Sequence, residues 1–146
     1  MAALPVIGWI GAGRMGVPMA GFVLKAGYAV TVFSRNAANR RKLVAKGARE
    51  AASAAECART ADIVVSSLPD DNALREVVLG AQGVLANARR GMIFVDTSTV
   101  SPEVSAEVER AAALHGVAYL RVPISGNAKQ AETGDLTALV SKPEDA

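Results

Sequence analysis

Short runs of branched apolar residues alternate along the chain with longer segments in which apolar residues recur at helical spacing. The apolar runs predict strands over residues 5–10, 29–33, 62–68, 92–96 and 118–122, with a further candidate at 136–140. Helical segments fall between these runs, at about 14–26, 39–46 and 101–115, with shorter helices beginning at Ser53 and at Asp70 or Asp71. Strands that alternate with helices are typical of a mostly parallel sheet covered on both faces, so we expect a doubly wound α/β fold.

The clearest helix boundaries lie in the second half of the chain. Ser101 and Pro102 have the residue types preferred at an N-cap and at the first helical position, and Gly116 ends the same helix. Residues 141–145 again have the composition of a helix start, yet the sequence stops at Ala146. We therefore expect a single domain over residues 1–146 that is cut short at its C-terminal end.

A glycine-rich turn follows the first predicted strand and opens the first helix. Its residues are Gly11, Ala12, Gly13, Arg14, Met15 and Gly16. In this G-x-G-x-x-G pattern the first glycine allows a tight turn, the second lets the backbone approach a pyrophosphate, and the third lets helix and strand pack closely. The helix N-terminus also offers free N–H groups to phosphates. The context predicts a dinucleotide-binding turn of the Rossmann type, rather than a glycine turn without a ligand.

The end of the second strand indicates which dinucleotide binds. NAD sites usually carry an Asp or Glu there for the ribose 2′-hydroxyl, whereas this chain has Ser34, Arg35 and Asn36, followed by Arg40 and Arg41. Arg35 offers a charged fork of donors to a 2′-phosphate, and its two neighbours can add hydrogen bonds. The residues favour NADP, with NAD as the second choice. The alternative is that these arginines form a solvated helix face.

Composition narrows the functional classes. Hydrophobic residues make up 51% of the chain, enough for a core, and the net charge of +2 creates no broad attraction for nucleic acid. The apolar stretches are too short to cross a bilayer, and the first residues lack the basic region of a secretory signal. Cys57, the single cysteine, supplies neither a disulfide nor a metal cluster. We expect a cytoplasmic protein with no metal, nucleic-acid or membrane partner.

Hydroxyl, amide and small side chains dominate the loops that follow the later strands. These loops contain Leu68 and Pro69 after the third strand, Thr99 after the fourth, and Ser125, Gly126 and Asn127 after the fifth. Ligands of open parallel sheets bind outside the carboxyl ends of the strands, so these residues, Thr99 among them, are candidates for binding. The loops contain no evident general acid or nucleophile, so no catalytic residue is assigned in this chain.

Four motifs, in order, link this sequence to a known family. They are the run from Ile7 to Gly16, Leu68-Pro69-Asp70, Asp96-Thr97-Ser98-Thr99-Val100-Ser101-Pro102, and Pro123-Ile124-Ser125-Gly126. This series resembles the β-hydroxyacid dehydrogenases, a group that includes 3-hydroxyisobutyrate dehydrogenase and, more distantly, 6-phosphogluconate dehydrogenase. The resemblance extends over nearly the whole chain. It implies a Rossmann-type NAD(P)-binding domain.

The resemblance also implies roles for the motif residues. The turn at residues 11–16 is expected to cradle the pyrophosphate, and residues 34–36 to surround the adenosine ribose. Leu68 and Pro69 are expected to line the cofactor, and Thr99 to touch its nicotinamide half. Ser125, Gly126 and Asn127 correspond to the Ser-Gly-Gly that holds the substrate carboxylate in the family.

Two features depart from the family pattern. Asn127 stands where the family usually has glycine, so its side chain either adds a substrate contact or narrows the pocket. The family's proton-transferring lysine lies on a long helix of an all-helical C-terminal domain, and this sequence ends before it. Members generally associate through that domain. The resemblance therefore implies the cofactor-binding part of a larger, homo-oligomeric enzyme.

These observations lead to one functional hypothesis and two alternatives. The leading hypothesis is an NADP-preferring oxidoreductase that transfers hydride between nicotinamide and a small β-hydroxyacid or semialdehyde, a carboxylate substrate. One alternative is a reductase of another C=O or C=N substrate, such as an imine. The other is an NAD(P)-binding module or sensor that catalyses no reaction.

Overall fold

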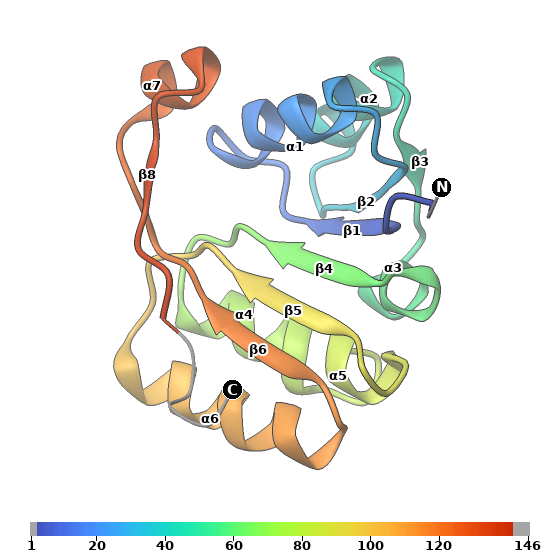
Figure 1. Ribbon diagram of the computed structural model, residues 1–146, viewed down its shortest axis with the longest axis vertical. Helices are drawn as coiled ribbons and strands as arrows, with labels where there is room; N and C mark the ends of the chain where they lie inside the picture. The colour runs from blue at the N-terminus through green and yellow to red at the C-terminus, as the bar shows by residue number, and fades with distance from the viewer. Residues whose placement is uncertain (1–2, 142–146) are drawn as a thin grey trace.

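The computed structural model describes residues 3–141 and contains a six-stranded parallel sheet (Figure 1). Its strands are β1 (Ile7–Ile10), β2 (Val30–Phe33), β3 (Arg49–Glu50), β4 (Ile63–Ser66), β5 (Ile93–Asp96) and β6 (Ala118–Arg121). Their order is β3-β2-β1-β4-β5-β6, so the chain begins in the middle of the sheet and winds outward in both directions. Ile10 lies opposite both Phe33 and Ser66 in the register. Sheets of this order bind ligands between β1 and β4, where the winding direction reverses.

Helices cover both faces of the sheet, which confirms the expected doubly wound fold (Figure 1). On one face lie α1 (Gly16–Lys25) and α2 (Ala37–Ala45). On the other lie α3 (Ala54–Thr60), α4 (Asp71–Leu79), α5 (Val84–Asn87) and α6 (Pro102–Leu114). Because side chains alternate along a strand, β1 contributes Trp9 to the first face and Ile10 to the second.

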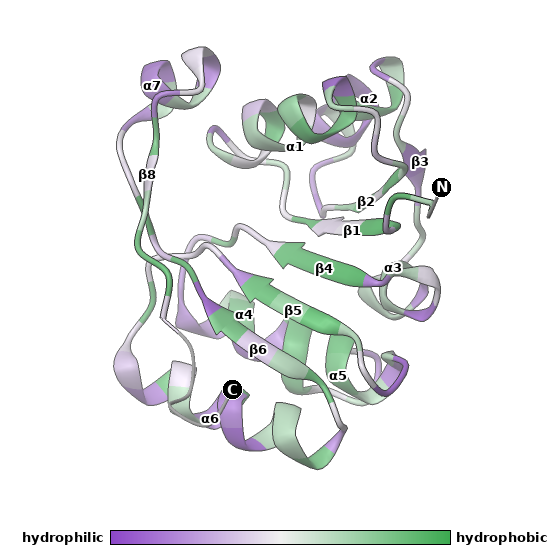
Figure 2. Ribbon diagram, in the orientation of Figure 1, coloured by the Kyte–Doolittle hydropathy of each residue, from purple (hydrophilic) through white to green (hydrophobic). Residues whose placement is uncertain are grey.

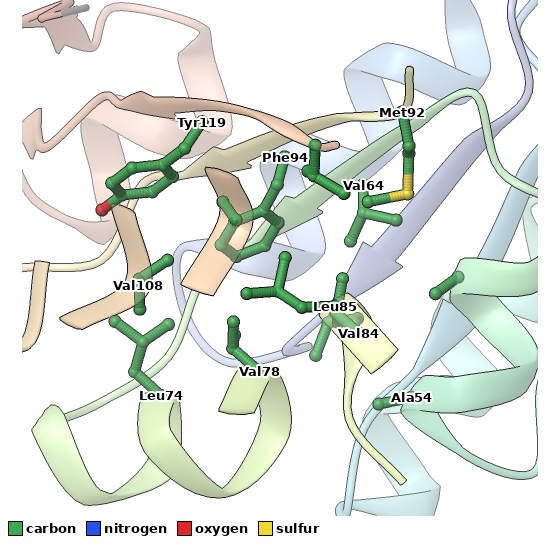
Figure 3. Close-up of a cluster of buried hydrophobic side chains, with 14 of the residues drawn as sticks. Ala54, Val64, Leu74, Val78, Val84, Leu85, Met92, Phe94, Val108 and Tyr119 are labelled. Atoms are coloured by element: carbon green, nitrogen blue, oxygen red, sulfur yellow. The ribbon is translucent and has the colours of Figure 1, made fainter. Parts of the chain in front are cut away.

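The larger core lies between the sheet and helices α3 to α6 (Figure 3). Phe94 and Tyr119 stack with their ring centroids 5.8 Å apart, and Val108 of α6 packs beside them. Leu74 and Val78 reach the same cluster from α4, four residues apart on one helical face. Figure 2 shows the corresponding pattern, with hydrophobic residues concentrated in β4 and β5. This packing fixes where the loops after these strands emerge.

The helix boundaries confirm the local signals in the sequence. Ser101 caps α6 by accepting a hydrogen bond from the Val104 N–H at 3.2 Å, and Gly116 follows the helix with a φ of +67°. Ser53 caps α3 through the Glu56 N–H at 3.1 Å. Asp70, rather than Asp71, caps α4.

The candidate strand at 136–140 is not a sixth strand of the large sheet. Its middle forms β8 (Thr137–Ala138), which pairs antiparallel with β7 (Ile124–Ser125) in a separate two-stranded sheet. Three short elements, β3, α5 and α7 (Ala128–Thr133), were not predicted from the sequence. These elements have two to six residues, too few for a periodic pattern to reveal. The helix start expected at 141–145 falls largely outside the described residues.

Among residues 3–141, no helix is long and apolar enough to cross a membrane. The same part of the chain contains no group of three or more His, Cys, Asp and Glu side chains arranged to hold a metal ion.

Candidate functional site

A cavity of about 450 Å³ opens at the carboxyl ends of β1, β2 and β4, where the winding direction of the sheet reverses. Most residues that the sequence assigned to the cofactor line it: Gly11, Ala12, Gly13, Arg14, Met15, Ser34, Arg35, Asn36, Leu68 and Pro69. Segments far apart in sequence therefore meet at one place. Asn39 and Val77 also line the cavity and were missed by the sequence analysis, because only the packing of α2 and α4 brings them there.

The three glycines of the turn have different steric surroundings. Gly11 has a φ of +101°, and a Cβ atom there would lie 2.0 Å from the carbonyl oxygen of Ser67. A Cβ on Gly16 would lie 2.1 Å from the carbonyl oxygen of Gly11, so Gly16 lets α1 begin directly against the turn. Gly13 differs, since a Cβ there would meet no atom within 4 Å. Gly13 is therefore dispensable for packing and faces the open space of the cavity.

Two further features prepare this turn for an anion. The Trp9 indole N–H donates a buried hydrogen bond of 3.0 Å to the Gly11 carbonyl, which holds the turn against β1. The N-terminus of α1 at Met15 has no side-chain cap, whereas Asn36 caps α2 and Asp70 caps α4. The first N–H groups of a helix require acceptors, and at α1 no side chain among residues 3–141 provides one. A phosphate bound beside Gly13 would supply that acceptor.

Arginine side chains gather at the end of β2 but have different environments. Arg40 donates to the Ser34 carbonyl and pairs with Glu50 at 2.7 Å, so two of its three guanidinium nitrogens are engaged within the protein. Arg35 lines the cavity with a side chain that is 66% exposed, and its contact with Glu76 is longer, at 3.5 Å. Arg35 is therefore the cation at this end of the cavity that can turn toward a ligand.

The two polar neighbours of Arg35 are partly committed to local structure. The Ser34 hydroxyl accepts a hydrogen bond of 3.3 Å from the Asn36 N–H. The Asn36 side-chain oxygen caps α2 through the Asn39 N–H at 3.0 Å, which also explains why α2 begins before the predicted residue 39. The hydroxyl hydrogen of Ser34 and the side-chain NH₂ group of Asn36 remain available to donate hydrogen bonds to a ligand.

A second cavity of about 250 Å³ continues the first toward β5 and β7. The two share their lining at Met15, Ser67, Leu68 and Pro69, so they form one groove across the carboxyl edge of the sheet. Thr99 and Gly126 line the second cavity.

Ser125 and Asn127 lie beside this groove without lining it. Ser125 is exposed on β7. Asn127 is the N-cap of α7 and forms a capping box with Gln130, in which each side chain accepts a 2.9 Å hydrogen bond from the other residue's N–H. The capping box occupies the Asn127 side-chain oxygen, which leaves its NH₂ group for an outside contact.

A buried polar network holds the loops that separate the two cavities. Asp96, fully buried at the end of β5, accepts hydrogen bonds from the Ser66 hydroxyl at 2.8 Å and the Ser98 N–H at 3.0 Å. The Ser98 hydroxyl in turn accepts from the Leu68 N–H at 2.8 Å. Burial raises the pKa of the Asp96 carboxyl above its usual value. The network ties the loop after β4 to the loop after β5, and so positions Leu68 in the groove.

The groove is suited to binding rather than to proton transfer. Its described lining residues include the cations Arg14 and Arg35 and no Asp, Glu, His, Lys or Cys side chain. The lone thiol, Cys57, is buried beneath the sheet and donates to the Thr31 carbonyl at 3.2 Å, and burial raises its pKa to about 12. The described part of the groove can thus neutralise and orient an anionic ligand.

Comparisons with known proteins agree with this geometry. The model of the "NAD binding domain of 6-phosphogluconate dehydrogenase" matches residues 6–146. The chain is 39% identical over 138 residues to 2-(hydroxymethyl)glutarate dehydrogenase of Eubacterium barkeri, a match that covers 94% of this chain and 46% of that protein.

Solved structures give the same result. The 3-hydroxyisobutyrate dehydrogenase of Mycobacterium tuberculosis, solved with L-serine, has a TM-score of 0.90 and 32% identity over 98% of this chain and 48% of its own. An imine reductase from Myxococcus stipitatus in complex with NADP+ has a TM-score of 0.79 and 29% identity, over 86% of this chain and 43% of its own. The chain spans about half the length of these relatives. With its fold, motif order and family match in agreement, the chain belongs to the β-hydroxyacid dehydrogenase family and carries that family's NAD-binding domain.

Proposed function

We propose that this chain is the cofactor-binding domain of an NADP-preferring oxidoreductase that acts on a small β-hydroxyacid or semialdehyde. The observation that carries the proposal is the continuous groove, with an uncapped helix N-terminus at its centre and the exposed Arg35 at one end. The bound cofactor supplies a hydride at its nicotinamide ring. The residues of this chain bind it, orient it and shape the space beside it.

Each part of the groove suits one part of the dinucleotide. The turn around Gly13 and the N–H groups at the start of α1 would hold the pyrophosphate, for which the helix dipole adds a favourable field. Arg35 would pair with the 2′-phosphate, assisted by donors from Ser34 and Asn36. The absence of a carboxylate at residues 34–36 removes the usual partner of a 2′-hydroxyl.

The second cavity would hold the nicotinamide ring and the reacting end of the substrate. Thr99 offers a hydroxyl to the nicotinamide half, and Leu68, held by Ser98, forms the wall beside it. Ser125 and the NH₂ group of Asn127 would donate to a substrate carboxylate beside Gly126. We place the group that exchanges a proton with the substrate oxygen outside the described lining of these two cavities, because that lining offers no side chain suited to the task.

The comparisons also favour a second candidate, reduction of a C=N bond. An imine reductase shares the fold of this chain and binds NADP+. The two candidates differ in what the substrate end must recognise, a carboxylate or an uncharged imine. The donors at Ser125 and Asn127 favour the carboxylate.

We also propose that the whole protein is a homo-oligomer in the cytoplasm, with small molecules as its ligands.

The test is an assay of the full-length protein with NADPH and with NADH. The substrates are short semialdehydes, small β-hydroxyacids in the reverse direction, and cyclic imines. We expect turnover of a carboxylate-bearing substrate with a higher kcat/KM for the phosphorylated cofactor. Turnover of imines alone would support the second candidate, and cofactor binding without turnover of any substrate would indicate a binding module or sensor.

A further inference from the structure

One carboxylate outside the groove lies against the cation that the proposed function uses. Glu76 extends from α4, and its Oε2 atom lies 3.5 Å from Nη1 of Arg35. The two side chains come from opposite sides of the larger cavity, since Arg35 follows β2 and Glu76 precedes Val77, which lines the wall that α4 contributes. The ion pair therefore joins the residue after β2 to α4 beside the larger cavity.

The packing of α4 determines the position of Glu76. Asp70 caps the helix, and Leu74 and Val78 bury its inner face in the core. Glu76, two residues after Leu74 and two before Val78, is thereby turned out of the core toward solvent. Its side chain is 67% exposed. Glu76 is thus held near Arg35 by the helix rather than by burial, and either side chain can leave the pair at little cost.

Arg35 has no second carboxylate partner among residues 3–141. Glu50 pairs with Arg40 instead. A 2′-phosphate would bring about two negative charges to the same guanidinium. The phosphate would compete with Glu76 for the Arg35 guanidinium, and the Glu76 carboxylate would repel it. A 2′-hydroxyl carries no charge, so it leaves the ion pair in place.

We propose that Glu76 is a specificity-determining residue that limits the preference for NADP over NAD by competing with the 2′-phosphate for Arg35. The proposal rests on the proposed function, in which Arg35 binds that phosphate. Glu76 weakens binding of the phosphorylated cofactor selectively, and the chain thereby accepts both dinucleotides with a smaller ratio of affinities than Arg35 alone would give.

The experiment compares Glu76→Gln with the wild type by titration with NADPH and NADH, following nicotinamide fluorescence. Gln keeps the size of the side chain and removes its charge. We expect NADPH to bind about threefold to fivefold more tightly to the variant, in the range for exposed ion pairs, and NADH to change less than twofold. The matched control is Glu109→Gln, which removes the same charge from the exposed face of α6, away from the groove. It should leave both dissociation constants unchanged.

A second background tests whether Glu76 acts through Arg35. In Arg35→Ala, the further change Glu76→Gln should shift the NADPH dissociation constant by less than it does in the wild type. An equal effect of Glu76→Gln on both cofactors, or none on either, would overturn the role of Glu76 and leave the proposed function standing. If Arg35→Ala left the NADPH affinity unchanged, the proposed 2′-phosphate site itself would fall, and the inference with it.

Discussion

Gly13 provides a test that separates ligand binding from folding. A Cβ at Gly13 meets no atom within 4 Å, and its φ lies outside the left-handed region, so Gly13→Ala should fold normally. It should even gain about 0.4–1 kcal/mol, because alanine restricts the unfolded chain. The added methyl group instead enters the space proposed for the pyrophosphate. An overpacking penalty of about 1–3 kcal/mol corresponds to roughly 5- to 150-fold weaker binding of NADPH.

Gly11 should give the opposite result. Gly11→Ala combines a φ of +101° with an approach of 2.0 Å to the backbone carbonyl of Ser67, which cannot move aside as a flexible side chain would. Backbone strain and overpacking together should destabilise the fold by about 2–6 kcal/mol. Gly80→Ala is the matched control, because its Cβ would make an ordinary 3.6 Å contact with the Glu76 carbonyl, away from the cavity lining.

Two assays distinguish these outcomes. Urea unfolding can be followed by the fluorescence of Trp9, the single tryptophan, which is buried with 3% exposure. NADPH binding can be followed by the fluorescence of the nicotinamide. If Gly13→Ala bound NADPH as tightly as the wild type, the pyrophosphate would not lie at this turn. If Gly11→Ala were as stable as Gly80→Ala, the steric explanation of the turn would be wrong.

Four further variants test the packing beside the groove and in the core. Ser98→Ala should destabilise the protein by about 1–3 kcal/mol in thermal unfolding, because the Leu68 N–H loses its acceptor. The control Ser105→Ala should destabilise the protein less, since the Ser105 hydroxyl has no hydrogen-bond partner among the described residues. Phe94→Ala should cost about 3–5 kcal/mol in urea unfolding, and a loss below 1 kcal/mol would contradict its place in the core. Burial raises the pKa of the Cys57 thiol from 9.0 to about 12, so the folded state holds the proton more tightly than the unfolded chain and the free energy of unfolding should fall as pH rises above 9. Cys57→Ala should therefore lose stability less steeply than the wild type between pH 8 and 10. Parallel curves of stability against pH would refute this.

The parts of the fold that the sequence predicted are those with local causes. The glycine turn, the cap at Ser101 and the core strands depend on neighbours a few residues away, so residue type and spacing were sufficient. The candidate strand at 136–140 failed for the opposite reason. Its apolar residues indicated an extended segment, but only the course of the chain after β6 decides that it pairs with β7.

The same distinction applies to the site. The residues lining the groove at Gly11, Arg35 and Leu68 were predicted, because the loops after parallel strands converge at one edge. The positioning role of Asp96 was not predicted, because its partner Ser66 is 30 residues away and the hydrogen bond between them forms only when β4 and β5 pair. The Glu76 contact with Arg35 likewise depends on how α4 packs, and no sequence spacing signals it.

The most direct test of the central claim is a titration of the wild type and Arg35→Ala with NADPH and NADH under identical salt conditions. The groove should bind NADPH more tightly than NADH in the wild type. Arg35→Ala should weaken NADPH by roughly tenfold, as expected for loss of a charge-assisted pair, and leave NADH nearly unchanged. Equal affinities for the two cofactors, unaffected by the substitution, would contradict the proposed NADP preference, and absence of binding would contradict the assignment of the groove itself.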